Sequence, residues 1–367
     1  MAKRNKFGIY DGCNLKVGGS ALMEGVMMKN EDAIAMAVRT SDGEIKIIKK
    51  KSKGAGKKRK FSKLPFIRGA YNLFESMIDS VYYLTKSAEF IDLELDEKKS
   101  EEPSKMGKFL ERVFKDKLMN IMMVISVIFS LLFSIGIFML LPKVISELIG
   151  IYDNVVLKNA VEGLIRITLF VSYIFLSTRL KDIRRVFSYH GAEHKTIHCF
   201  EHNEELTVEN VKKYSTLHPR CGTAFMFFIM LISILLFSFI DIGLNALNIG
   251  NTVVIKVFAR FIFMPLLAGI TYELTRFAMK SKLKIIRAIN APGISMQRIT
   301  TYEPDDEMIE VAISSLKAVI DESVPFNTEE EIKEMIKASQ GVTAKIKSVQ
   351  ESSVSWDDSE NIEGTDE

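Results

Sequence analysis

The stretch LMNIMMVISVIFSLLFSIGIFMLL, residues 118–141, indicates the fold class, because its 24 residues carry no charged side chain. At 1.5 Å per residue, a helix of this length spans about 36 Å, enough to cross the hydrocarbon core of a bilayer. Further apolar stretches follow at 161–178, 225–240 and 257–278. The sequence therefore predicts an α-helical multi-pass membrane protein with about four spans.

The composition agrees with this fold class. The chain has 367 residues, with 49 Lys and Arg against 46 Asp and Glu, and 47% of its residues are hydrophobic while 26% are charged. Such different populations are expected to separate into a membrane core and polar flanks. Three cysteines exclude a disulfide-stapled secreted scaffold. The first 20 residues contain no apolar core, so we expect no cleavable signal peptide.

The basic residues between the apolar stretches predict an orientation. They number ten in 46–63, five in 179–195 and five in 276–287, against two in 142–160 and one in 241–256. By the positive-inside rule, we expect both termini and the loop 179–221 to face the cytoplasm. The expected location of the protein is the inner (cytoplasmic) membrane of a cell. The run KKKSKGAGKKRK (49–60) has no interleaved aromatic residues, so we expect no nucleic-acid partner. The protein's main partner is the lipid bilayer. The first interpretation of the basic run is a solvated loop, and contact of 46–63 with anionic lipid head groups is the secondary one.

The polar flanks predict further structure. Two strand-like runs, 33–40 and 44–50, are separated by Ser41-Asp42-Gly43, which is typical of a hairpin. Residues 64–92 have apolar positions at helical spacing: Leu73, Phe74, Met77, Ile78, Val81 and Leu84. This face could lie in the membrane interface or pack on the loop domain, and we favour packing.

Seven segments follow from these patterns. They are a basic N-terminal cytoplasmic β-containing unit (1–63), an amphipathic or interfacial helical region (64–117), spans one and two (118–178), a cytoplasmic His-rich loop (179–221), spans three and four (222–278), a cytoplasmic C-terminal helical segment with a helix at 306–320 (279–320), and an acidic tail (321–367). The tail holds seven acidic residues and no basic one from Glu351 onward, so we expect it to be disordered.

All five histidines lie between positions 190 and 218. His190 and His194 enclose Glu193 in an H-x-x-E-H pattern, and on a helix their side chains stack one turn apart. Zinc peptidases use this order, in which two histidines bind the metal and the glutamate activates water. His218 and Cys221, just before the third span, are the candidates for the third ligand. Cys199, Glu201 and His202 are further candidates, although His202 is typical of a solvated helix end.

Several motifs resemble the YqhQ family of bacterial membrane proteins, over residues 15–320. They are GGSALMEGVMM (18–28), FIRG (66–69), YHGAEHK (189–195), ELTVEN (205–210), HPRCGT (218–223), Tyr272-Glu273 and 292–318. Members of this family are described as predicted metal-dependent enzymes. On the matching positions, the resemblance implies functional roles for His190, Glu193, His194, His218 and Cys221.

The function we predict is that of a metal-dependent hydrolase with a divalent metal, zinc first. His190, His194 and either His218 or Cys221 would be ligands, and Glu193 the general base. One alternative is a non-enzymatic membrane scaffold or assembly factor stabilised by a structural metal or by histidine hydrogen bonds. Another is a transporter that uses Arg260 and Glu273 within the fourth span, provided that these side chains face a polar cavity.

Overall fold

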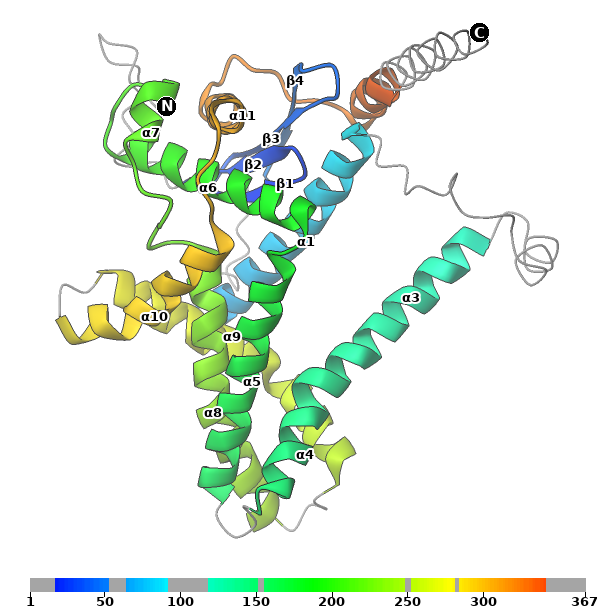
Figure 1. The fold of residues 1–367 in the computed structure, drawn as a ribbon, viewed down its shortest axis with the longest axis vertical. Helices are drawn as coiled ribbons and strands as arrows, with labels where there is room; N and C mark the ends of the chain where they lie inside the picture. The colour runs from blue at the N-terminus through cyan, green and yellow to red at the C-terminus, as the bar shows by residue number, and fades with distance from the viewer. Residues whose placement is uncertain are drawn as a thin grey trace, which may run out of the picture.

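The computed structural model describes residues 17–52, 64–91, 118–150, 155–247, 252–280 and 284–340. A small sheet and the helices around it lie at one end of the molecule, and long apolar helices extend from that end (Figure 1). The predicted combination of a mostly helical chain and an N-terminal β unit is therefore confirmed.

The sheet is a four-stranded antiparallel meander. Its strands are β1 (Gly18–Leu22), β2 (Gly25–Lys29), β3 (Ala33–Arg39) and β4 (Ile45–Lys51), paired in that order. The two strands expected near 33–40 and 44–50 are present, and Gly43 adopts a positive φ of 85° in the turn between them. The glycine-rich segment before them adds β1 and β2, which turn at Glu24.

Both faces of the sheet are covered, because residues alternate between them along each strand. One face packs on α6 (Lys181–Glu201) and α11 (Asp306–Ile320) through Ala35 and Ala37 of β3. The other face packs on α1 (Ile67–Ile91) and on helical residues 329–340 through Met36 and Val38. Segments that are far apart in the chain thus share one folded unit.

The packing predicted for the apolar face of α1 is wrong. Phe74 is 50% exposed and Val81 64%, and Met77, Ile78 and Leu84 are also exposed. The helix is attached to the sheet unit by a different side, which includes Asp79, Tyr83 and Phe90. Asp79 accepts a hydrogen bond of 2.6 Å from Lys29 of β2. The membrane-interface alternative remains as the prediction for the apolar face.

The first part of the acidic tail (321–367), for which disorder is expected, is folded. Residues 329–340 are helical, and Ile332 and Ile336 are buried against the sheet. Part of the basic stretch 46–63 is involved as well, because Lys49 donates 2.6 Å to the Asp321 carbonyl and Lys50 pairs with Glu329. The remainder of that stretch from residue 53, and the tail from Glu351, lie outside the described residues. Contact of the basic stretch with anionic lipid remains a prediction.

Four helical stretches of the described chain are long and apolar enough to cross a membrane: Ile125–Leu148, Leu157–Ser177, Phe225–Ala246 and Ile255–Phe277. The first combines α3 (Leu118–Ile135), the π-helix η4 (Gly136–Leu140) and α4 (Leu141–Leu148), and the others belong to α5 (Val155–Ser177), α8 (Gly222–Ala246) and α9 (Val253–Lys280). In Figure 1, α5, α8 and α9 form a bundle from which α3 diverges. The number of predicted spans agrees with the structure.

Glycines allow close helix contacts in this bundle. A Cβ on Gly163 of α5 would lie 2.3 Å from Ile234 of α8, and one on Gly69 of α1 would lie 2.5 Å from Tyr272 of α9. Beside the second contact, Arg68 binds Glu273 with two hydrogen bonds, one of them 2.6 Å from Nε to Oε1. Glu273 therefore ties α1 to α9.

Candidate metal centre

The helix α6 carries the H-x-x-E-H pattern directly beneath the sheet. Gly191 is required there because the backbone of residues 300–302 crosses the helix at this point. A Cβ on Gly191 would lie 2.1 Å from the Tyr302 carbonyl oxygen, and the Tyr302 N–H donates 3.0 Å to the Phe187 carbonyl. This crossing segment follows α10 (Lys284–Thr300) and reaches the side of His190.

Backbone carbonyls orient both histidines of the pattern. His190 Nδ1 lies 2.9 Å from the Thr300 carbonyl oxygen, and His194 Nδ1 lies 2.5 Å from that of Thr216. A carbonyl only accepts, so each Nδ1 carries a proton, and in the neutral imidazole each Nε2 then keeps its lone pair. Burial lowers the pKa of His194 and favours its neutral form. Metal-binding histidines are commonly held in this way.

Cys221 supplies the third converging atom. It is the N-cap residue of α8, and its Sγ lies 3.3 Å from His190 Nε2. One ligand atom each from His190, His194 and Cys221 lies within 4.8 Å of the other two. Imidazole nitrogen and thiolate sulfur are ligands that zinc prefers, so these residues fit the predicted metal.

Glu193 lies beside this group and is 5% exposed. Its Oε2 is 3.9 Å from His190 Nε2, and a Cβ on Gly19 of β1 would lie 2.9 Å from its Oε1. Burial raises the pKa of the Glu193 carboxyl, and the nearby imidazole of His190 offsets part of this effect. The nearby cations have other partners, because Arg185 binds Glu24 and Lys195 binds Glu303.

His218 belongs to a second group with His198 and Glu201. Its Nδ1 accepts 3.2 Å from the Arg220 N–H, and its Nε2 lies 3.4 Å from Glu201 Oε2. Glu201 also pairs with Arg220. The His218 ring centroid lies 5.6 Å from that of His194, but the group of converging ligand atoms around His190 and His194 contains Cys221 and not His218.

The two remaining candidates have structural surroundings. His202 is the exposed C-cap of α6, as its sequence context indicates, with Nδ1 2.7 Å from the His198 carbonyl oxygen. Cys199 is buried in the core beneath the sheet, and burial raises the pKa of its thiol to about 12. Neither residue belongs to the group around His190.

Sequence reasoning missed the residues that position the centre. Gly19 lets β1 approach Glu193, and Glu24 in the β1–β2 turn accepts 2.6 Å from Arg185 and 3.1 Å from the Tyr189 hydroxyl on α6. Gln297 of α10 exchanges two hydrogen bonds of 2.8 Å with the His218 backbone. The motif at residues 18–28 was the available signal for Gly19 and Glu24, although no role could be assigned to it from its letters.

Comparison with known proteins supports the resemblance. The model of a family described as "Protein of unknown function (DUF1385)" matches residues 64–322. The chain belongs to this family. It is also 31% identical over 306 residues to "Uncharacterized protein YqhQ" of Bacillus subtilis (strain 168). The aligned region covers 83% of this chain and 92% of that protein. The resemblance to the YqhQ family is thereby confirmed. No solved structure matches the chain.

Proposed function

We propose that the protein is a metal-dependent hydrolase whose centre lies at the cytoplasmic surface of the cell membrane. The convergence of His190, His194 and Cys221, with both Nδ1 atoms bound to backbone carbonyls, carries this proposal. The four apolar helices and the distribution of basic residues support the location.

In this proposal His190 Nε2, His194 Nε2 and Cys221 Sγ hold a zinc ion. When bound, zinc acts as a Lewis acid and lowers the pKa of coordinated water towards neutrality. Three protein ligands leave room for a water or a substrate, whereas a structural zinc site has four.

Glu193 is the group that would accept a proton from the attacking water. It lies close to the ligand atoms without being one of the three that converge, and burial raises the pKa of its carboxyl, so it is a stronger base than an exposed glutamate. Because Gly19 has no side chain, β1 can lie directly against this carboxylate.

A second candidate function is a membrane scaffold in which the same cluster is purely structural. The observation that favours it is the number of segments that the cluster joins. Hydrogen bonds from the two histidines connect α6 to Thr216 and Thr300, and Cys221 begins α8. A transporter is less well supported, because Glu273, one of the two residues behind it, is paired with Arg68.

Glu193→Gln separates the two candidates, since it keeps the shape of the side chain and removes its basicity. A strain lacking its own copy of the gene is complemented with wild type, Glu193→Gln or Glu209→Gln, the last being an exposed control on α7 (Val208–Lys212). Metal content and melting temperature are measured on the purified proteins. A hydrolase predicts that Glu193→Gln retains metal and fold but fails to complement, whereas Glu209→Gln complements. Full complementation by Glu193→Gln would refute the hydrolase.

A further inference from the structure

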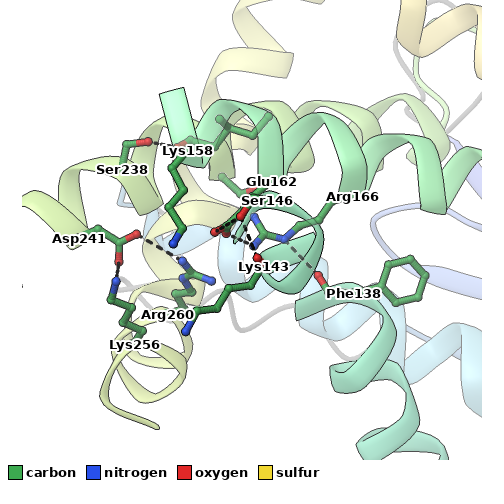
Figure 2. Close-up of polar contacts among 12 residues, drawn as sticks. Phe138, Lys143, Ser146, Lys158, Glu162, Arg166, Ser238, Asp241, Lys256 and Arg260 are labelled. Carbon is green, nitrogen blue, oxygen red and sulfur yellow. Dashed lines mark hydrogen bonds and ion pairs between the residues drawn. The ribbon is translucent and has the colours of Figure 1, made fainter. Parts of the chain in front are cut away.

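A second polar cluster lies in the half of the helix bundle away from the sheet. Figure 2 shows charged side chains from α4, α5, α8 and α9 pointing towards one another between these helices. We call the cations among them the far-end cations: Lys143, Lys158, Arg166, Lys256 and Arg260. Asp241 of this cluster follows Cys221 by 20 positions on α8, or about 30 Å of helix, so the cluster is separate from the candidate metal centre.

Within the described chain, three carboxylates are paired with these five cations. Glu147 is shared, with its Oε1 3.2 Å from Lys158 and 3.9 Å from Lys143. Asp241 is shared as well, with Arg260 at 3.4 Å and Lys256 at 4.0 Å.

The third carboxylate, Glu162, lies 3.0 Å from Arg166 and 3.4 Å from the Ser146 hydroxyl. Five positive and three negative side chains leave an excess of two positive charges. The four most buried charged side chains, Arg166, Glu162, Arg260 and Asp241, balance one another. The excess therefore belongs to the lysines, whose side chains are 25–29% exposed and can be reached by an anion.

Two buried hydrogen-bond donors in this region are also left over. The side chains of Arg260 and Asn159 are 12% and 5% exposed, and Arg260 Nε and Asn159 Nδ2 have no hydrogen-bond partner. Asp241 Oδ1 lacks a hydrogen bond too, although Lys256 lies at 4.0 Å. Buried donors without acceptors destabilise a fold, and they indicate an acceptor ligand when positive charge is in excess around them.

The π-helix η4 adds a local distortion at the same place. Arg166 Nε donates 3.1 Å to the Phe138 carbonyl within η4. Single π-helical turns inside α-helices are frequent at functional sites. This bond and the Glu162 pair fix the Arg166 guanidinium within the bundle.

We propose that the far-end cations form a binding site for a phosphate group, carried by a lipid head group or by a small soluble anion. Arg and Lys side chains are the usual phosphate-binding groups in proteins, and arginine adds donors in a rigid fork. A phosphate would neutralise the charge excess and offer an acceptor to Arg260 Nε. This inference does not depend on the proposed hydrolase activity.

Titration of the purified full-length protein in a phosphate-free maltoside detergent tests the site. The probes are inorganic phosphate and the short-chain lipid dihexanoyl phosphatidic acid, and calorimetry measures the dissociation constant of each. Lys143→Gln/Lys158→Gln removes two charges from side chains that are partly exposed, so the fold is expected to survive. Arg260→Lys keeps the positive charge and removes the forked arrangement of guanidinium N–H donors. Lys212→Gln on α7 is the control at the other end of the molecule.

We expect saturable binding of at least one probe, weakened 10-fold or more by Lys143→Gln/Lys158→Gln and by a smaller factor by Arg260→Lys. Lys212→Gln should bind like wild type, and so should His190→Ala/His194→Ala, which separates this site from the metal centre. Binding of the lipid alone identifies a head group as the ligand, and binding of both probes identifies the phosphate itself. The proposal is overturned if wild type binds neither probe, or if the double lysine variant binds within twofold of wild type.

Discussion

His190 Nε2 lies 3.3 Å from Cys221 Sγ, although 31 positions separate these residues in the chain. The contact forms because α6 and the start of α8 meet beneath the sheet, and because Thr300 and Thr216 turn the two imidazoles of α6 towards the sulfur. Two histidines and one buried carboxylate of α6 are thereby brought together with the sulfur of Cys221, the N-cap of α8.

Gly191→Ala should destabilise the protein. Alanine usually stabilises a helix interior by up to about 1 kcal/mol relative to glycine, but here its Cβ would lie 2.1 Å from the Tyr302 carbonyl oxygen. Overpacking against backbone typically costs about 1–3 kcal/mol. The control is Gly243→Ala in α8, where a Cβ has no neighbour within 4 Å. Melting temperatures in detergent test the pair, and equal stability of Gly191→Ala and wild type would contradict the crossing of residues 300–302 over α6.

Ile332→Ala should destabilise the protein, because residues 329–340 belong to the folded unit around the sheet. Ile332 is 1% exposed against the sheet, and truncating such a side chain costs about 2–4 kcal/mol. Glu334→Ala, an exposed neighbour on the same helix, should stay within about 0.5 kcal/mol of wild type. Denaturant titration measures both variants. A silent Ile332→Ala would mean that this helix does not dock on the sheet.

The orientation can be tested with single cysteines. We expect that Lys212→Cys, exposed on α7, reacts with a membrane-impermeant maleimide only after the cells are opened. Asn154→Cys, between the first and second apolar stretches, should react in intact cells. The reason is the excess of basic residues in 179–195 and 276–287 over 142–160 and 241–256. Labelling is compared with wild type, which reports the native cysteines. Reaction of both variants from the same side would contradict the predicted topology.

The sequence predicted those features that depend on local pattern. Long stretches that are mostly apolar located the four candidate spans, and alternation around Ser41-Asp42-Gly43 located β3 and β4. The spacing of His190 and His194 placed both imidazoles on one side of a helix, and Cys221 was among the candidates for the third ligand.

What the sequence could not predict depends on contacts between distant segments. The apolar spacing of α1 identified a face but not its partner, and the structure leaves Phe74 and Val81 exposed. The choice between His218 and Cys221 depends on Arg220 and Glu201, which occupy both His218 nitrogens. The carbonyls of Thr216 and Thr300 orient the histidines, and backbone groups leave no trace in residue identity.

Metal analysis of the purified protein tests the central claim most directly. Wild type prepared without chelators should contain about one zinc per chain, with X-ray absorption showing nitrogen ligands at about 2.0–2.1 Å and sulfur at about 2.3 Å. His194→Ala and Cys221→Ala should lose the metal, whereas His198→Ala, in the neighbouring group, should retain it. A wild-type protein without bound metal, or a zinc content unchanged by both His194→Ala and Cys221→Ala, would contradict the account.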